Sequence, residues 1–323
     1  MKVNKETFFK KTENFNNVPF SQSTGYFDLK FSHKNNYAFF LNEQLSPSIG
    51  CYAREIKIPV VGGRFLHIES ICYDHFESEK LIVFLEQLIN YDYKIINIVD
   101  DNIYSPILEI AFRTAEFRRP IGQFGTSLSI LINLNNELNY SRSWKRNIKI
   151  AKKNGDFTCK NIINFDEKII DEIAVLFKEN SQIKKLSYCY SKHDLFNIMK
   201  DPKWKLFVAQ INNKIVAARV IYTNDKIAYD FTTANGHKSR EIRGVTHALV
   251  DYIFDFLKKN DFNYFDFSRL PISRKGAEGV SEFKLGSRGD IIKYNGEWIY
   301  TKKSILRWVI YLMNKFVRKK YEY

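Results

Sequence analysis

The chain has 323 residues, of which 45% are hydrophobic and 15% aromatic, and its formal net charge is +14 at pH 7. This composition excludes a disordered chain, and the length is enough for two ordinary domains with a core in each. The positive charge favours an anionic partner, namely nucleic acid, a nucleotide-linked substrate or anionic lipid, or else it belongs to solvated basic faces.

The first half of the chain predicts a meander of strands, then a helix and a strand. Turn residues separate three strand-like runs, which are residues 37–41, 50–56 and 64–68; the turn residues are Pro47, Pro59 and Gly62-Gly63. Large apolar residues recur at helical spacing from Glu77 to Asn90, so we expect a helix there. The next predicted strands are Ile95–Val99 and Thr126–Asn133.

The densest basic segment lies between Tyr140 and Asp156, and its spacing predicts an amphipathic helix. Trp144, Ile148 and Ala151 share an apolar face, and a second face carries the cations Arg142, Arg146, Lys149 and Lys153. Such a basic face suits tRNA or a pyrophosphate, or it is the solvated side of a linker helix.

The second half predicts the same order of elements as the first. A helix around Asp166–Asn180 and a shorter one after His193 precede three strands, residues 205–211, 215–223 and 227–233, which turn at Asn212-Asn213 and Asn224-Asp225. A helix follows Gly244, and Tyr264–Phe267 is a short aromatic strand. The repeated order indicates two copies of one α/β domain.

A flexible basic loop is predicted after this last strand. It is punctuated by proline and glycine and carries five cations: Pro271, Gly276, Gly279, Gly286 and Gly289, with Arg269, Arg274, Lys275, Lys284 and Arg288. Glycines let backbone approach a ligand closely, so the loop suits an anionic ligand or a developing negative charge.

Several of these stretches together resemble the FemABX family of aminoacyl- and acyltransferases, which are built on GNAT-type acetyltransferase domains. The matching stretches are an entry motif with Pro19, Gln22-Ser23, Tyr26 and Lys30; the basic helix with Arg146-Asn147-Ile148-Lys149 and Ala151; the helix start at Gly244; YFDFSR at 264–269; and Phe283-Lys284. The resemblance implies an α/β fold of two tandem GNAT-like domains, 1–140 and 141–304, each a mixed, largely antiparallel sheet flanked by helices.

The resemblance also implies roles for individual residues. Lys284, after Phe283, lies at the transfer site and stabilises the tetrahedral oxyanion. Lys30 helps to hold the phosphates of a nucleotide-linked acceptor; its structural interpretation is a surface lysine. An acidic residue at Asp100 or Asp101 is a candidate base for the acceptor amine, and Asp266 and the substrate itself are the other candidates. The competing interpretation of Asp100 or Asp101 is a cap for the helix near Pro106.

Other family positions match less completely. Arg243 and Gly244 lie where GNAT enzymes place their pyrophosphate loop, but only Gly244 fits the pattern, so acyl-CoA and aminoacyl-tRNA both stay open as donors. The resemblance implies that Tyr229 and Asp230 contact the acceptor, and the alternative for Tyr229 is a half-buried tyrosine of the sheet. Arg269 is a candidate for binding an anionic substrate, although a family member would usually show Gly-Gly where this chain has Ser268-Arg269.

These observations predict direct transfer of an acyl or aminoacyl group to an amine on a cell-envelope precursor. The acceptor is a peptidoglycan precursor or an amino sugar carried on a nucleotide or lipid. The sequence has no Gly-x-Ser-x-Gly elbow, Walker loop, dinucleotide fingerprint or metal cluster, so neither a covalent enzyme intermediate nor a bound cofactor or metal is expected. Two alternatives stay open: a non-enzymatic nucleic-acid-binding protein and a catalytically silent GNAT-like partner.

The predicted location is the cytoplasm. The four cysteines have no paired spacing, and neither a membrane-spanning run of about 18 apolar residues nor the apolar core of a signal peptide occurs. At the C-terminus, residues 305–323 are expected to form a basic amphipathic helix whose apolar face is Ile305, Trp308, Val309, Leu312, Met313 and Phe316. This helix either lies on the anionic inner face of the membrane or docks on its own protein.

Overall fold

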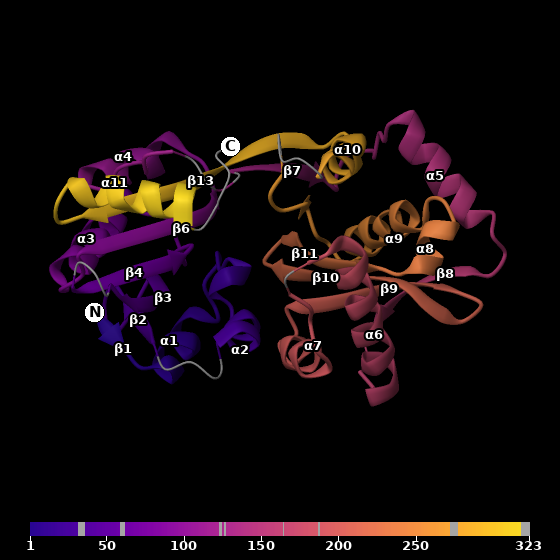
Figure 1. Cartoon of the computed structure of the whole chain (residues 1–323), viewed down its shortest axis with the longest axis horizontal. Helices are drawn as coiled ribbons and strands as arrows, with labels where there is room; N and C mark the ends of the chain where they lie inside the picture. Colours follow the sequence, from indigo (N-terminus) through magenta and orange to yellow (C-terminus); the bar gives the residue numbers. More distant parts are fainter. Residues whose placement is uncertain are drawn as a thin grey trace.

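The computed structural model describes residues 1–31, 36–58, 62–122, 125, 127–163, 165–186, 188–271 and 277–317. Its residues form two α/β halves that lie side by side (Figure 1). The predicted residues Pro59, Thr126, Arg274, Lys275 and Gly276, and also Arg318 and Lys319, lie outside the described ranges. Among the described helices, none combines the length and the apolar character needed to cross a membrane.

The first half contains the predicted meander, helix and strand. Its strands are β1 (Lys2–Val3), β2 (Tyr37–Leu41), β3 (Ile49–Lys57), β4 (Arg64–Glu69), β5 (Cys72–Tyr73), β6 (Ile95–Ile103) and β7 (Leu128–Asn133). Its helices are α1 (Lys5–Thr12), the 3-10 turn η1 (Phe20–Gln22), α2 (Thr24–Phe31), α3 (Ser78–Asn90) and α4 (Pro106–Thr114). The predicted stripe of α3, including Phe84 and Leu88, is buried in a core with Phe112 of α4.

The second half repeats this arrangement. Its helices are α5 (Arg142–Lys152), α6 (Glu167–Lys184), α7 (Lys192–Met199), α8 (His237–Glu241), α9 (Val245–Lys259) and α10 (Glu278–Gly286). The last described elements, α11 (Ile305–Leu312) and the π-helical turn η2 (Met313–Val317), follow in sequence, and α11 lies on the first half (Figure 1). Its strands are β8 (Phe157–Ile162), β9 (Trp204–Ile211), β10 (Lys214–Asn224), β11 (Ile227–Asn235), β12 (Tyr264–Asp266) and β13 (Asp290–Thr301). Asn212 and Asn213 both have positive φ and form the predicted β9–β10 turn.

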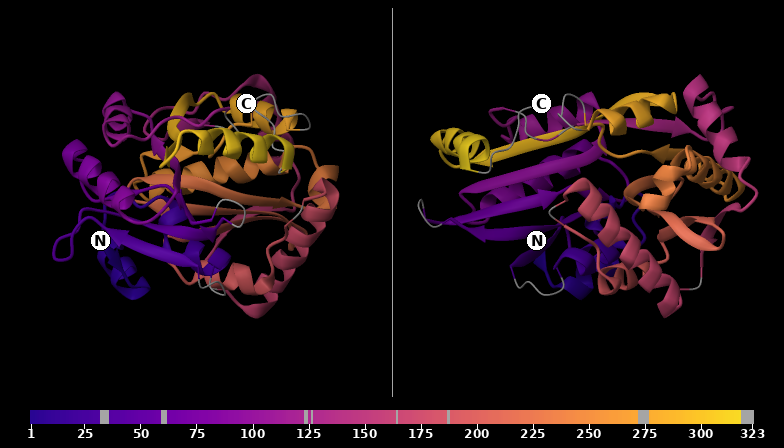
Figure 2. Two further views of the ribbon diagram at one scale, coloured as in Figure 1. Left: turned by 60° about the vertical axis from the view of Figure 1, so that its left-hand side comes forward. Right: turned by 45° about the vertical axis from the view of Figure 1, so that its right-hand side comes forward.

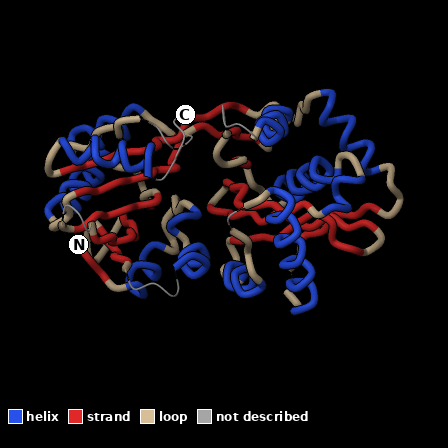
Figure 3. Tube along the Cα trace, viewed as in Figure 1, coloured by secondary structure: helices blue, strands red, loops and turns tan. Residues whose placement is uncertain are grey.

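Helices cover both faces of the part of the sheet that lies in the second half. Residues alternate along a strand, so Phe207 of β9 packs with α5 and α9 while its neighbours Leu206 and Val208 pack with α6 and α7. The predicted apolar face of α9 is buried at Val245, Leu249, Ile253 and Leu257. Figure 3 shows these helices around the strands of each half.

Two strands join the halves into one mixed sheet. Its order is β1-β2-β3-β4-β6-β13-β7-β12-β11-β10-β9-β8. Residues 290–293 of β13 pair with β7 and residues 294–301 pair with β6, so this strand spans both halves (Figure 2). β7 in turn pairs with β12. The domain boundary predicted between residues 140 and 141 stays a prediction. β7 precedes this boundary in the sequence, but it pairs with β12 and β13, which follow it.

The structure corrects two sequence expectations. The basic loop predicted after Tyr264–Phe267 contains helix α10, and Gly286 at its end packs so closely on Trp144 that a Cβ would lie 2.5 Å from the indole. The apolar face predicted for the C-terminal helix, for which docking on the protein was one of two interpretations, does not dock, because α11 packs on Ile95 and Ile299 through Leu306. That face is exposed: Ile305, Trp308, Val309, Leu312, Met313 and Phe316.

Candidate active site

A cleft of about 1590 Å³ lies where the two halves meet, and residues from both line it. The cleft opens because two parallel strands part. β11 pairs with β12 only from Ile227 to Tyr229, and it then continues to Asn235 while the chain turns away after Asp266. Residues from Asp230 to Asn235 therefore lie along the open side of β11, and most of them line the cleft.

The turn after β12 forms the next wall of the cleft, and its backbone is strained. Ser268 and Arg269 have φ of 50° and 25°, in the left-handed region that favours glycine. This geometry gives a physical reason for the Gly-Gly that the resembling family usually has here. The Lys284 ammonium holds the turn, because its Nζ donates to the carbonyl oxygens of Phe267 (2.6 Å), Arg269 (3.0 Å) and Ser268.

Lys284 lines the cleft and carries a perturbed pKa. Burial lowers this pKa to about 8, with Asp230 and Asp266 opposing the shift and Arg219 adding to it. Phe283 beside it anchors α10: its ring lies 4.9 Å from the Trp144 ring, and its carbonyl accepts the indole N–H at 2.8 Å. The three N–H groups of this ammonium already donate to backbone carbonyls, so what it offers to a carbonyl oxygen that becomes negative is its charge, which acts strongly in a partly dry cleft.

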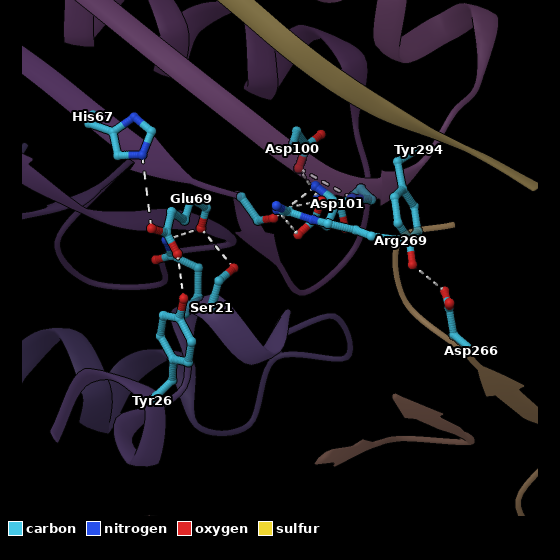
Figure 4. A network of polar contacts seen from close by, with 12 residues as sticks. Ser21, Tyr26, His67, Glu69, Asp100, Asp101, Asp266, Arg269 and Tyr294 are labelled. Atoms are coloured by element: carbon cyan, nitrogen blue, oxygen red, sulfur yellow. Dashed lines mark hydrogen bonds and ion pairs between the residues drawn. The ribbon is translucent and has the colours of Figure 1, made fainter. Parts of the chain in front are cut away.

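The first half contributes a polar cluster on the opposite wall (Figure 4). The Tyr26 hydroxyl donates to Glu69 Oε2 at 2.7 Å, and Lys30, one helical turn after Tyr26, donates to that hydroxyl. His67 Nε2 lies 3.9 Å from Glu69 Oε1. Burial opposes ionisation of Glu69, but Lys30, the Tyr26 hydroxyl and His67 outweigh it, so the pKa of Glu69 lies below its ordinary value.

The entry motif positions this cluster. Gln22 is fully buried; its amide donates to the carbonyls of Tyr52 (3.2 Å) and Glu69 (2.6 Å), and its oxygen accepts the Tyr52 N–H at 2.7 Å. These bonds fix the start of α2 on β3 and β4. Lys30 therefore lies in the cleft lining, where its predicted role in phosphate binding stays a prediction, and its bond to the Tyr26 hydroxyl is not visible in the motif.

Asp101 faces the cleft, whereas Asp100 does not line it. Asp101 pairs with Arg269 at 3.0 Å, and the charge of Asp101 is the chief cause that raises the pKa of Arg269. Asp100, its neighbour on the same strand, points to the other side and is 1% exposed. Burial raises the pKa of Asp100 to about 6, and its oxygens accept from Asn102 (2.6 Å) and Asn295 (2.8 Å).

The capping interpretation of these two aspartates is wrong. Ser105 is the N-cap of α4, and its hydroxyl accepts the Leu108 N–H at 3.2 Å. Asp266, another acid considered as a base, also lies behind the cleft wall. Its carboxylate accepts from the Ser268 N–H (2.8 Å), the Tyr294 hydroxyl (2.7 Å) and Ser129, and burial raises its pKa (Figure 4).

The second half contributes a basic end to the cleft at the start of α9. Gly244 has φ of 94°, and a Cβ there would lie 1.9 Å from the Asn147 carbonyl oxygen, so only glycine lets α5 and α9 approach. Arg243 Nε donates to Asn147 Oδ1 at 2.8 Å. Lys184 and Arg240 line the same end, which is therefore suited to phosphate oxygens.

The structure brings together Lys30, Arg243, Gly244, Arg269, Phe283 and Lys284 around the cleft, and it leaves Asp100 and Tyr229 outside its described lining. Tyr229 is a half-buried tyrosine of β11, opposite Asp266 in the ladder, with its ring 6.3 Å from that of Tyr222. Sequence reasoning missed Glu69 and Arg219. A lone arginine within the apolar run of β10 is a signal that points to Arg219.

The predicted basic face of α5 lies outside this cleft. On α5, the predicted basic face is exposed and borders a shallow groove of about 410 Å³, lined by Arg142, Lys145, Arg146, Lys149, Ile150 and Lys153. Cys72 is buried and donates to the Gly50 carbonyl at 3.0 Å. The described residues contain no group of three or more histidines, cysteines, aspartates or glutamates that would hold a metal.

No family model and no curated protein matches the chain, but solved structures share its fold. FemX superposes with a TM-score of 0.75 at 12% identity, over 96% of this chain and 99% of FemX. L-PGS from Bacillus licheniformis gives 0.68 at 14% identity, over 98% of each chain. The C-terminal domain (DUF2156) of a putative lysylphosphatidylglycerol synthetase from Agrobacterium fabrum gives 0.66 at 12%, over 98% of this chain and 97% of that one.

These likenesses cover nearly the whole chain. They confirm the predicted α/β fold of two similar halves, which this chain shares with FemX and L-PGS.

Proposed function

We propose that this protein is an N-acyltransferase that moves an acyl or aminoacyl group to an amine on a cell-envelope precursor. The observation that carries the proposal is the Lys284 ammonium, which lines the cleft between the two halves and is held there by backbone carbonyls. The fold shared with FemX and with a putative lysylphosphatidylglycerol synthetase supports transfer chemistry of this class. The donor is acyl-CoA or aminoacyl-tRNA.

The proposed reaction is direct attack on the donor carbonyl. A neutral acceptor amine forms the new C–N bond, and the carbonyl oxygen becomes negative beside the Lys284 ammonium. When the tetrahedral species collapses, the C–S or C–O bond to the donor breaks, and the amine proton leaves with the thiol or hydroxyl product. Removal of one such preorganised donor typically lowers turnover by about 10²–10³-fold.

The acceptor is assigned to the wall that carries Lys30 and Arg269. Lys30 donates to the Tyr26 hydroxyl, which itself donates to Glu69, and Arg269 pairs with Asp101. These bonds hold the two cationic side chains on the cleft surface. Arg269 is 47% exposed, so donors on its guanidinium remain accessible to an anionic ligand. The phosphates of a nucleotide- or lipid-linked precursor fit this chemistry.

The C-terminal helix is proposed to contact an anionic membrane surface. The exposed apolar residues of this helix lie at helical spacing and form one stripe. They include Trp308 and Phe316, which are 53% and 65% exposed. Lys302, Lys303 and Lys315 lie beside it and are exposed. An apolar stripe with tryptophan and flanking lysines is typical of helices that lie in the interface of anionic bilayers.

Sedimentation with phosphatidylglycerol vesicles tests this contact. The full chain is expected to sediment with them and not with phosphatidylcholine vesicles, and the double variant Trp308→Ser/Phe316→Ser is expected to stay in solution. Ile107→Ser on α4, which is 55% exposed outside the stripe, is the matched control. The membrane contact would be refuted if the double variant still bound the vesicles. It would also be refuted if the wild-type protein were a dimer and the double variant a monomer.

Transfer itself is tested on a pool of envelope precursors. Incubation with acyl-CoA in one arm and with charged tRNA in another, followed by mass spectrometry, is expected to give a precursor heavier by one acyl or aminoacyl group. Lys284→Met should abolish most of this product. The absence of any mass increment with either donor class would refute the proposal.

A second candidate function rests on the exposed basic face of α5. Because its five cations lie along one groove, non-enzymatic binding of nucleic acid is the alternative. Filter binding at several salt concentrations separates the two: a steep salt dependence for random RNA or DNA, together with no transfer, favours this alternative.

A further inference from the structure

Asp100 lies behind the cleft, close to two of the contacts that join the halves. One contact is strand β13, which spans both halves and pairs with Asp100 through Gly296 (Figure 4). The other is the N-terminal segment 16–18, whose backbone carbonyls accept from Asn224 Nδ2 at 2.9 Å and from the Tyr222 hydroxyl at 3.1 Å. Both of these donors belong to β10, so the second half holds this segment.

The Asp100 carboxylate is bonded toward both contacts. Its Oδ2 accepts from Asn295 Nδ2 of β13 at 2.8 Å. Its Oδ1 accepts from Asn102 Nδ2 at 2.6 Å, and Asn102 Oδ1 in turn accepts from Asn17 Nδ2 at 2.5 Å. One buried acid of β6 is therefore connected to β13 on one side and to residues 16–18 on the other.

The direction of these hydrogen bonds requires an ionised carboxylate. The Trp298 indole N–H can only donate, and it donates to Asn295 Oδ1 at 3.0 Å, so the amide nitrogen of Asn295 faces Asp100. Asn102 Nδ2 also donates to the Ile71 carbonyl at 2.9 Å, which fixes that amide in the same way. A proton on either oxygen of Asp100 therefore meets an N–H donor, and one of the two bonds is lost.

We infer that Asp100 is a positioning residue whose ionised carboxylate fixes the relative position of the two halves, and that uptake of a proton releases one of its two connections. This inference does not depend on the transfer reaction. The bond from Asn295 lies at the register shift of β13 between Tyr294 and Gly296, where a strand bends most readily. Loss of this bond therefore acts at the place that sets the width of the cleft.

A mildly acidic pH is expected to supply the proton. Burial raises the pKa of Asp100 to about 6, the bonds from Asn295 and Asn102 oppose this rise, and the charge of Asp101 adds to it. At this pKa the protonated share is about 3% at pH 7.5 and about 90% at pH 5. Tyr73, on which the charge of Asp100 acts, stays neutral in this range because burial raises its pKa to about 12.

Distances between spin labels on the two halves test this inference without requiring turnover. The labels are attached at Glu86→Cys on α3 and Lys178→Cys on α6, in a full chain that also carries Cys189→Ser, and all three positions are exposed. With Asp100 intact, we expect one narrow distance distribution at pH 7.5 and a second, broader population in most molecules at pH 5. Asp100→Asn should show this second population at both pH values.

An exchange of the acid and the amide tests the direction of the bonds. In Asp100→Asn/Asn295→Asp every donor faces an acceptor again. Asn102 donates to the amide oxygen at position 100, the amide nitrogen at position 100 donates to the acid at position 295, and Trp298 donates to the other oxygen of that acid. This double variant is expected to restore the single narrow distribution at pH 7.5.

Asp251→Asn is the matched control. Asp251 accepts from the Tyr140 hydroxyl at 3.0 Å and from Lys152 at 2.7 Å, and all three residues belong to the second half or its border, so the distances should match those of the wild type.

Four outcomes would overturn the inference. They are a narrow distribution in Asp100→Asn at pH 7.5, an unchanged wild-type distribution between pH 7.5 and pH 5, a distribution in Asp100→Asn that still changes between these pH values, and a folded exchange variant as broad as Asp100→Asn. If Asp100→Asn does not fold, the wild-type pH series and the exchange variant decide.

Discussion

The pH dependence of transfer is a direct test of Lys284. Burial lowers the pKa of its ammonium to about 8 from an ordinary value of 10.5. An ammonium that stabilises the oxyanion must keep its proton, so wild-type kcat is expected to fall by about tenfold for each pH unit above this pKa. Lys284→Arg keeps a cation that does not deprotonate in this range, so the fall should disappear in that variant.

Lys284→Met completes the test. Its kcat is expected to be about 10²–10³-fold lower, with the acceptor KM nearly unchanged. Initial rates by mass spectrometry provide both constants. Lys258→Met is the matched control, because Lys258 also donates to a backbone carbonyl, that of Asn136 at 3.1 Å, but lies outside the cleft. An alkaline fall that persists in Lys284→Arg, or equal losses in kcat and acceptor affinity, would refute the assigned role.

The same pKa predicts a change in stability with pH. Between pH 8 and 10.5 the unfolded chain holds the Lys284 proton and the folded chain does not, so the free energy of unfolding should rise with pH across this window. Below pH 8 both states are protonated, and the cost of burying the ammonium is fully present. The free energy of unfolding of wild type minus that of Lys284→Met, both measured by urea unfolding, should therefore increase with pH only in this window.

Three further substitutions test the cleft. Gly244→Ala is expected to lower the free energy of unfolding by about 2–4 kcal/mol, because Gly244 has a positive φ and a Cβ there would collide with the Asn147 carbonyl. The control Gly155→Ala, whose Cβ would lie in open space, should change this free energy by less than about 1 kcal/mol, and urea unfolding measures both variants. Ser268→Gly is expected to raise that free energy by about 1 kcal/mol, since it relieves a left-handed φ and removes a buried hydroxyl that has no partner among the described residues; a loss in the same assay would contradict this. Lys30→Met should raise the acceptor KM by roughly ten- to a hundredfold at nearly constant kcat, and a change in kcat alone would argue against phosphate binding.

Elements with local signals were predicted well. The helical stripe of α3, the apolar face of α9 and the Asn212-Asn213 turn each depend on spacing or backbone preference within a short segment. Those signals survive because the tertiary contacts of these segments reinforce them. The repeated order of elements in the two halves also let the fold be predicted by resemblance.

Features that depend on contacts across the fold were not visible in the sequence. The glycines at 279 and 286 suggested a loop, but packing of the α10 segment on Trp144 stabilises a helix there. Pairing of β13 with both β6 and β7 is set by the whole arrangement of strands. Asp100 and Asp101 follow the predicted strand Ile95–Val99 and lie within β6. Which of the two faces the cleft depends on the side of the sheet that the other half covers.

Strand β13 couples the two walls of the cleft mechanically. It runs from β7, beside the turn that Lys284 holds, to β6, which carries Asp101, and its register shifts between Tyr294 and Gly296, where both residues line the cleft. Gly296 has φ of 77°, as expected of a glycine that permits such a bulge. A bulge is where a strand bends most readily, while the ladders on either side resist bending. A change in the width of the cleft that kept both ladders intact would therefore bend the sheet at Tyr294–Gly296.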